Sequence, residues 1–226
     1  MNSIVKKTLT VLGILLALYS LTSLFGIFKI YTNSTVANEP NLKLGSKFVV
    51  SNLATPKNGD YISYRFNDPV FGKHSRVHRL CGMSNDTVEI KNGVVYLNGK
   101  NMDTAYPLMH YYQTTIREYE TIRQKENIPD TNFMQLIDSN ILHTTLEDAV
   151  AQKYGLTSNR VMEEKGKVNQ PIASVFKQNW NKDNFGPLKI PQGKIFLLGD
   201  NRDYSEDSRY IGLINEADIL GVVILK

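Results

Sequence analysis

The chain of 226 residues is 42% hydrophobic and 21% charged, a composition that excludes wholesale disorder. Its formal net charge of +4 is spread along the sequence, and no Lys/Arg-rich run with interleaved aromatics is present, so we expect no nucleic-acid partner. Cys81 is the only cysteine, which excludes an internal disulfide, and the absence of CxxC, HExxH and EF-hand spacings predicts no metal and no cofactor.

The N-terminal segment has the composition of a membrane-spanning helix. Residues 8–28 carry no charge and are mostly Leu, Ile, Val, Phe and Ala, which matches the ~20 residues needed to cross a bilayer. Lys6 and Lys7 precede them, and the positive-inside rule then places residues 1–7 in the cytoplasm. A cleavable signal peptide is the alternative, but the stretch is long and no clear A-x-A site follows.

We therefore predict a single-pass protein of the inner or plasma membrane. Its N-terminus is expected in the cytoplasm, and its body on the outer (periplasmic or extracellular) face, beside the lipid bilayer.

Two regions, residues 29–102 and 187–226, have the pattern of β-strands. Short runs of β-branched and aromatic residues are separated by Pro, Gly and Asn, as expected for a sheet with tight turns. Asn92-Gly93 joins two alternating runs and is a strong signal for a two-residue hairpin. The last run is apolar enough to predict a strand buried on both faces. The runs are KFVVSNL, GDYISYRF, DTVEIKNGVVYLNGK, GKIFLLGD and DILGVVILK.

The pattern changes between residues 103 and 186. The segments TTIREYETIRQKENI and NFMQLIDSNILHTTLEDAVAQKYG have helical spacing of apolar residues. In the second segment, Thr145-x-x-Asp148 is a start signal and Gly155 a stop signal. We expect a partly helical subdomain, inserted into the β body, that requires no function of its own.

A charged turn near the C-terminus is the most informative stretch. FLLGDNRDYSEDSRYIG runs from an apolar strand into acids and arginines, which are costly to bury unpaired, so a solvated turn with its own ion pairs is one interpretation. The part from Gly199 to Gly212, however, closely resembles the last sequence box of the type I signal peptidases. These are membrane-bound serine endopeptidases that remove leader peptides from exported proteins. Their pattern G-D-N-R-D-x-S-x-D-S-R-x-x-G is met at every specified position.

The resemblance extends to the N-terminal anchor, residues 35–100 and residues 187–226, whereas the middle of the chain has no counterpart. GMSNDTVEIKNGVVYLNGK is similar to the family's hairpin after the general base, and EPNLKLGSKFVV to its segment after the nucleophile. The resemblance implies amide hydrolysis at the membrane surface by a serine nucleophile, a base and an oxyanion hole. Preprotein leader peptides would be the substrates.

The resemblance also assigns supporting roles to the charged turn. The serine that matches Ser205 hydrogen-bonds the base in the family, and the residues that match Asp207 and Arg209 form a salt bridge. We therefore expect this turn to hold the proton-accepting group in place.

The nucleophile position departs from the family. Where the family reads roughly S-x-S-M-x-P, this sequence reads TVANEP from residue 35 to residue 40. Thr35 falls at the hydroxyl that helps to bind the oxyanion, and Ala37 falls at the nucleophilic serine. A methyl group cannot attack a carbonyl, and loss of such a nucleophile lowers turnover by about a millionfold.

The base position departs as well. Where bacterial members have lysine, this chain has His78-Arg79-Leu80, which resembles the V-H-R-V of the eukaryotic-reticulum and archaeal branch. Histidine titrates near a pKa of ~6.5 without desolvation and is a reasonable base. Asp207 is expected to orient its imidazole as in a serine-protease triad. A structural histidine packed in a strand is the alternative.

Three hypotheses fit Ala37. It is natural, and the protein is an inactive or altered homologue; it is an engineered replacement of serine; or the alignment is shifted and a neighbouring residue attacks. Ser34 is the fallback nucleophile, although it requires three extra residues before Pro40. Ser46 fits the start of a strand better than a nucleophile.

The sequence thus predicts a mainly β fold, with a signal-peptidase-like body, an inserted partly helical subdomain and an N-terminal transmembrane helix. The expected function is that of a signal peptidase I-like protein that cleaves leader peptides with small residues near the cleavage point, or only binds them if Ala37 is natural. The alternatives are an inactive homologue that binds preproteins or partners, and a specialised maturation peptidase of a conjugation or secretion system. In an active enzyme, Thr35 and the backbone N–H of residue 37 would stabilise the oxyanion beside the base His78.

Overall fold

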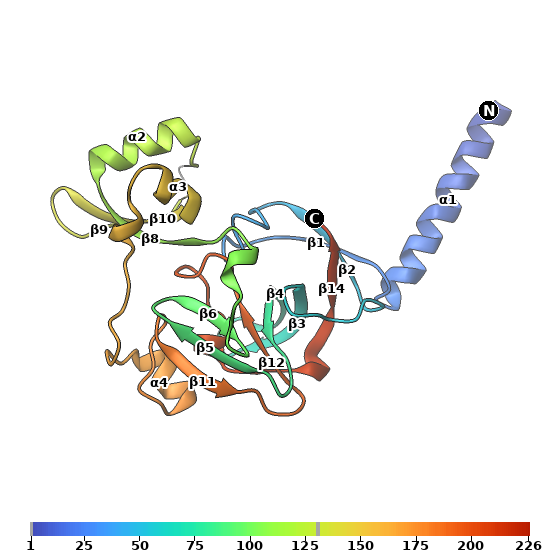
Figure 1. The fold of residues 1–226 in the computed structure, drawn as a ribbon. Helices are drawn as coiled ribbons and strands as arrows, with labels where there is room; N and C mark the ends of the chain where they lie inside the picture. The colour runs from blue at the N-terminus through green and yellow to red at the C-terminus, as the bar shows by residue number, and fades with distance from the viewer. Residues whose placement is uncertain (1, 130–131) are drawn as a thin grey trace.

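The computed structural model describes residues 2–129 and 132–226. It is mainly β, with an N-terminal helix that projects away from a body of packed sheets (Figure 1). A seven-stranded sheet in the order β1-β2-β14-β3-β4-β12-β13 and a four-stranded sheet in the order β11-β5-β6-β7 form the body, and a three-stranded sheet in the order β8-β10-β9 lies beside it.

The bounds of the strands are β1 Lys29–Thr32, β2 Lys47–Ser51, β3 Tyr61–Asp68, β4 Gly72–Gly82, β5 Thr87–Lys91, β6 Val94–Leu97, β7 Lys100–Asn101, β8 Met109–Thr115, β9 Met134–Leu136, β10 Ile141–Glu147, β11 Phe185–Lys189, β12 Lys194–Leu198, β13 Ile214–Asn215 and β14 Ile219–Leu225. Those of the α-helices are α1 Ser3–Leu24, α2 Ile116–Glu126, α3 Asp148–Lys153, α4 Gln170–Phe176 and α5 Ser208–Ile211. The 3₁₀ turns are η1 Asp103–Ala105, η2 Thr157–Asn159 and η3 Glu216–Asp218.

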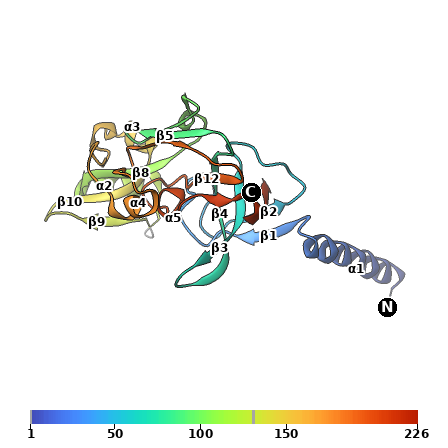
Figure 2. The ribbon, with the colours of Figure 1, turned by 90° about the horizontal axis from the view of Figure 1, so that it is seen from below.

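Helix α1 is long and apolar enough to cross a membrane, and none of its residues is buried against the body. It begins at Ser3 and ends at Leu24, whereas the sequence predicts a helix over residues 8–28. The earlier start follows from Lys6 and Lys7, which are good helix formers. The earlier end follows from Gly26, which has a φ of 71°, a conformation that stops helices. Figure 2 shows α1 and the three-stranded sheet at opposite ends of the molecule.

The seven-stranded sheet is centred on the long hairpin of β3 and β4. These strands pair antiparallel, with Ile62 opposite His78 and Tyr64 opposite Arg76. One hydrophobic core packs against this hairpin and against β12. Its buried members are Ile62, Tyr64, Leu80, Ile195, Leu197, Ile214 and Val222. A packed core on both strands fixes the register, because a slip of one residue would turn every side chain to the other face.

The predicted hairpin at Asn92-Gly93 is confirmed. Strands β5 and β6 pair antiparallel, with Lys91 opposite Val94. Asn92 and Gly93 have φ angles of 49° and 71°, as a tight turn with two left-handed residues requires.

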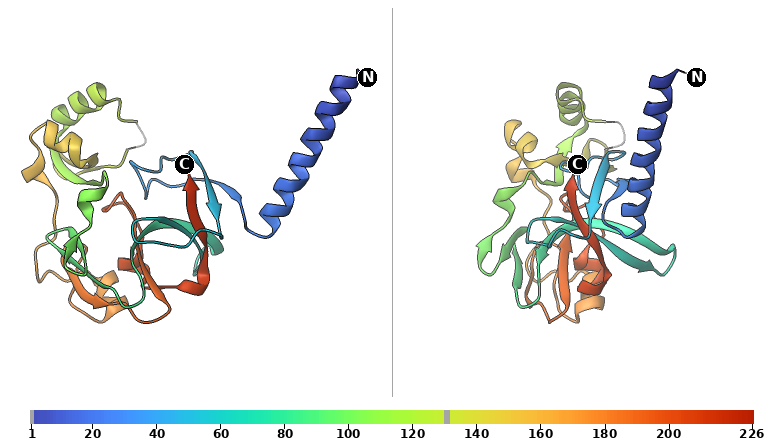
Figure 3. Two further views of the ribbon diagram at one scale, coloured as in Figure 1. Left: turned by 45° about the vertical axis from the view of Figure 1, so that its right-hand side comes forward. Right: turned by 90° about the vertical axis from the view of Figure 1, so that its right-hand side faces the viewer.

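Residues 109–129 and 132–161 form a small unit with its own core, in which α2 and α3 pack against β8 and β10 (Figure 3). The predicted helix within residues 114–128 is confirmed as α2, which Thr115 caps in a capping box with Glu118. The predicted helix over residues 132–155 is wrong in its first part, because β9 and β10 occupy most of it. In β10, Leu142, Thr144 and Leu146 are buried at every second position, so the tertiary packing selects the strand period.

The C-terminal part of the predicted insertion lies in the body. Ile172 of α4 and Phe185 of β11 belong to a core that also contains Val88, Ile90 and Phe196. Strand β14 also differs from its prediction, since it is not buried on both faces. Ile224 and Leu225 are 47% and 65% exposed, because an apolar run that pairs in a sheet is buried only where another layer covers it.

Candidate active site

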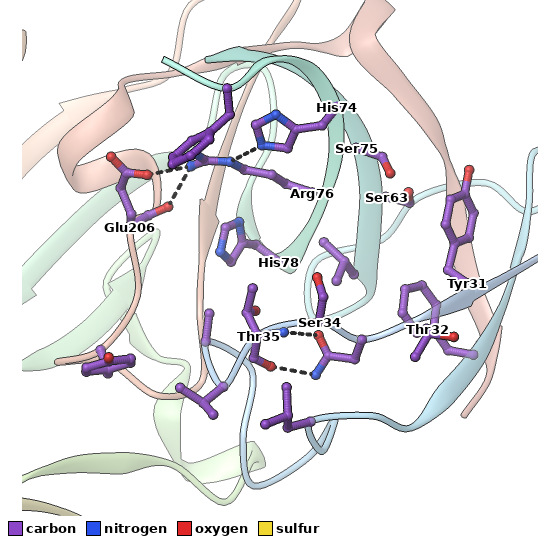
Figure 4. A pocket seen from close by; sticks show the side chains of 18 residues that line it. Tyr31, Thr32, Ser34, Thr35, Ser63, His74, Ser75, Arg76, His78 and Glu206 are labelled. Carbon is purple, nitrogen blue, oxygen red and sulfur yellow. Dashed lines mark hydrogen bonds and ion pairs between the residues drawn. The ribbon is translucent and has the colours of Figure 1, made fainter. Parts of the chain in front are cut away.

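A cleft of about 740 Å³ opens beside the end of β1. Residues 31–37, at the end of β1 and in the loop after it, line one side, and residues 74–78 of β4 line the other. Tyr204 and Glu206 of the charged turn also line it. Figure 4 shows Ser34, Thr35 and His78 around the same space.

His78 reaches the cleft from the middle of β4. His74, Arg76 and His78 follow one another at every second position of this strand, so they face the same side. The His78 side chain is buried, with only 4% exposure. Its Nε2 atom lies 3.3 Å from Oγ of Ser205, and its Nδ1 atom lies 2.9 Å from the hydroxyl of Tyr64.

Asp207 therefore accepts no hydrogen bond from the imidazole, contrary to the prediction. Tyr64 occupies the position that a triad carboxylate would take. The strand alternation in YISYRF places Tyr64 on the core face, but its contact with His78 depends on the register between β3 and β4. The sequence alone gave no signal for this register.

Burial lowers the pKa of His78 to about 4. The nearby carboxylate of Asp207 acts in the opposite direction, and the guanidinium of Arg76 adds to the lowering. The imidazole is thus neutral at pH 7, which is the form in which a histidine exchanges protons with a substrate or a hydroxyl.

Asp207 and Arg209 form a buried ion pair behind His78. Oδ2 of Asp207 accepts hydrogen bonds from Nη2 of Arg209 at 2.9 Å and from the backbone N–H of Gly199 at 3.1 Å. Oδ1 accepts one from Nε of Arg209 at 2.9 Å. Arg209 also donates to the carbonyl oxygen of Arg202. A buried ion needs such partners, because its desolvation is otherwise uncompensated.

The other charges of the turn are paired with distant elements. Nε of Arg79 in β4 donates to Oδ1 of Asp200 at 2.7 Å. Nη2 of Arg202 donates to Oδ1 of Asp103 at 2.6 Å. The turn therefore holds together β4, the turn η1 and the end of β12, and its own ion pair of Asp207 and Arg209 is buried rather than solvated.

The loop that carries Ala37 is fixed to the same turn. The backbone N–H of Asn201 donates to the carbonyl oxygen of Ala37 at 3.0 Å, and Nδ2 of Asn38 donates to the carbonyl oxygen of Val77 at 2.7 Å. These bonds place Ala37 next to the strand segment that carries His78.

Three polar groups of this loop are free to meet a ligand. Within residues 2–129 and 132–226, the hydroxyls of Ser34 and Thr35 and the backbone N–H of Ala37 have no hydrogen-bond partner, and all three residues line the cleft. Ser46 instead donates to the carbonyl oxygen of Lys43 at 2.6 Å. Ser34, Thr35, Ala37 and His78 thus share one cleft, with Ser205 on the imidazole and Asp207 and Arg209 behind it.

The far wall of the cleft carries a charged cluster that the sequence analysis missed. Nη1 of Arg76 lies 2.9 Å from a carboxylate oxygen of Glu206, and Nη2 of Arg76 lies 2.9 Å from Oδ2 of Asp68. Nε of Arg76 donates to Nε2 of His74 at 3.1 Å (Figure 4). This cluster ties the β3–β4 hairpin to the charged turn across the cleft.

Known proteins of one family are similar to this chain in sequence. A sequence profile of the family described as "Signal peptidase, peptidase S26" matches residues 2–226. Signal peptidase I of Aquifex aeolicus (strain VF5) is 26% identical over 210 residues, which cover 86% of this chain and 73% of that protein. Signal peptidase IB of Staphylococcus aureus (strain COL) is 29% identical over 199 residues, which cover 87% of this chain and 75% of that protein. A solved signal peptidase I from Enterococcus faecalis V583 aligns with a TM-score of 0.36 and 20% identity, over 75% of this chain and 97% of that one.

Proposed function

The chain belongs to the signal peptidase family, peptidase S26, and on this premise we propose that it binds leader peptides of exported proteins in the cleft beside His78. With alanine at residue 37, it holds these peptides without cleaving them through that position. The observation that carries this proposal is the retained cleft, with its free backbone N–H at Ala37, next to a methyl group that cannot attack a carbonyl.

The shape of the cleft suits an extended peptide. Strand β1 is an edge of the seven-stranded sheet, and Tyr31 and Thr32 of this strand line the cleft. An edge strand pairs with an extended ligand through its backbone groups. Small side chains at Ser34, Ala37 and Ser75 leave room for small residues of the peptide.

The helix α1 supports a location at the membrane surface. It would anchor the body beside the bilayer, with Lys6 and Lys7 on the cytoplasmic side and the cleft on the outer face. Leader peptides would then reach the cleft as they leave the bilayer.

A second candidate function is cleavage by a neighbouring hydroxyl. Ser34 favours it, because its hydroxyl lines the cleft and has no hydrogen-bond partner within the described residues. In this case the protein would be a peptidase with a displaced nucleophile.

The two functions are separated by a cleavage assay on the purified full chain in detergent with a preprotein. We expect no cleavage by the native chain and slow cleavage by the Ala37→Ser variant, in which a hydroxyl stands at the nucleophile position. A double variant, Ala37→Ser with His78→Gln, is the control and should lose the gained cleavage. Cleavage of the preprotein by the native chain at the rate of Ala37→Ser would overturn the proposal. Loss of that cleavage in the Ser34→Ala variant would assign the attack to Ser34.

A further inference from the structure

The side chains of Tyr64 in β3 and His78 in β4 form a buried hydrogen-bonded pair. The Tyr64 side chain is fully buried, with 0% exposure, and its hydroxyl lies 2.9 Å from Nδ1 of His78. In the part of the chain that the structure describes, Nδ1 is the only hydrogen-bond partner of this hydroxyl. On the other side of the imidazole, Nε2 lies 3.3 Å from Oγ of Ser205, a residue that is 8% exposed.

The position of the protons follows from the complete burial of the Tyr64 hydroxyl and from its shorter contact with the imidazole. Burial raises the pKa of the Tyr64 hydroxyl, so it keeps its hydrogen, and a buried hydrogen-bond donor without an acceptor is unfavourable. The Tyr64 hydrogen reaches one acceptor, Nδ1 of His78, which must then carry no hydrogen. A neutral imidazole has one N–H, so its hydrogen lies on Nε2 and is donated to Oγ of Ser205.

The opposite arrangement is less favourable. If Nδ1 carried the hydrogen and donated it to Tyr64, the Tyr64 hydrogen would be buried without an acceptor. Ser205 imposes a weaker demand, because its Oγ lies farther from the imidazole, at 3.3 Å from Nε2 against 2.9 Å between the Tyr64 hydroxyl and Nδ1, and its residue keeps 8% exposure. The difference between the two contacts therefore favours the tautomer with its hydrogen on Nε2.

We propose that Tyr64 is a positioning residue that holds His78 in the tautomer with its hydrogen on Nε2. This tautomer is the reverse of the one in a Ser-His-Asp triad, in which a carboxylate accepts from Nδ1–H and leaves Nε2 free to take a proton. The Nε2 atom of His78 therefore donates a hydrogen bond in the resting protein. The consequence for catalysis rests on the proposed function: a serine placed at residue 37 would meet an imidazole that must first move its proton to Nδ1.

The tautomer is measured directly by NMR on the full native chain in detergent micelles, with ¹⁵N-labelled histidine. The chain has four histidines, and the His78→Gln variant identifies the signals of His78. We expect Nε2 to be protonated and Nδ1 to be unprotonated at pH 7. A protonated Nδ1 with an unprotonated Nε2 would overturn the proposal. This readout depends on neither peptide binding nor cleavage, so it is independent of the proposed function.

The Tyr64→Phe variant supplies a second test. It removes the hydroxyl that donates to Nδ1, so the share of the Nδ1–H tautomer should increase several-fold in the NMR spectrum. Tyr61→Phe is the matched control. It removes another buried hydroxyl of β3, which donates to Asp200, and it should leave the His78 tautomer unchanged. An unchanged tautomer in Tyr64→Phe would contradict the proposal.

Cleavage assays test the catalytic consequence, because the two tautomers predict rate changes in opposite directions when Tyr64 is replaced. In the Ala37→Ser background, Tyr64→Phe should increase the rate several-fold, because the productive tautomer becomes more populated. If Tyr64 instead accepted from Nδ1–H, as a triad carboxylate does, its removal would lower the rate. A lowered or unchanged rate would therefore overturn the catalytic part of the proposal.

Discussion

The α-carbon of Gly199 lies directly against the carbonyl oxygen of Ala37. A β-carbon at residue 199 would come within 2.4 Å of this oxygen and within 2.3 Å of Oγ of Ser205. Glycine at this position thus allows the end of β12, the charged turn and the loop of residue 37 to meet. The requirement is steric, because the clash arises with backbone and with a short, buried side chain.

The Gly199→Ala variant should therefore be destabilised. We expect the free energy of unfolding to decrease by about 1 to 3 kcal/mol, as for other overpacked sites, and the midpoint of urea unfolding to decrease with it. Leader-peptide binding should weaken as well, because the loop of Ala37 must move. An unchanged midpoint would show that the close approach of Gly199 and Ala37 is not maintained in solution.

The ion pair of Asp207 and Arg209 should be essential for folding. Asp207→Asn leaves the buried guanidinium of Arg209 without its counter-ion, a change that typically lowers the free energy of unfolding by about 3 to 5 kcal/mol. Glu206→Gln is the matched control, since it removes the neighbouring carboxylate from an ion pair whose acid is 63% exposed, and it should lower that free energy by less than about 1 kcal/mol. Chemical denaturation measures both, and equal effects would contradict the structural role of Asp207.

The buried His78 predicts how stability depends on pH. Its pKa is about 4 in the folded chain, against about 6.5 in the unfolded chain. Between these values the unfolded state binds a proton that the folded state does not, so the free energy of unfolding rises with pH from about 4 to 6.5. Over this range the contribution is on the order of 3 kcal/mol, and it is lost as the pH falls.

Two measurements check this dependence. The ring protons of His78 should titrate in NMR with a midpoint near 4. The His78→Gln variant should show a shallower loss of stability at acidic pH, whereas the contribution of His110, whose pKa burial also lowers, should remain. A midpoint near 6.5 for His78 would mean that its side chain is open to water.

The resemblance to the type I signal peptidases predicted that Thr35, Ala37 and His78 share one site, and these three residues line one cleft. The match from Gly199 to Gly212 assigns the charged turn, and the spacing before Pro40 aligns Thr35 and Ala37 with the family's oxyanion and nucleophile positions. The charged turn, this loop and His78 are far apart in the sequence, so their convergence was predicted from the family resemblance and not from local patterns. A local feature such as the Asn92-Gly93 hairpin follows from neighbouring residues alone.

Long-range relationships could not be read from the sequence. The contact of Tyr64 with His78 depends on strand register, which many residues determine together. The segment 132–147 has an apolar spacing that fits a helix, but pairing with β8 selects a strand. The burial of Ile172 and Phe185 in the core of the body likewise depends on the final packing.

Photo-crosslinking shows whether the cleft beside His78 binds leader peptides, as we propose. A leader peptide with a photoreactive group near its small residues would be irradiated with the native full chain in detergent, and the labelled residues identified by mass spectrometry. We expect labels within residues 31–37 and 74–78, and their loss when an unlabelled leader peptide competes. Labels confined to residues 109–161, or no competable labelling, would contradict it.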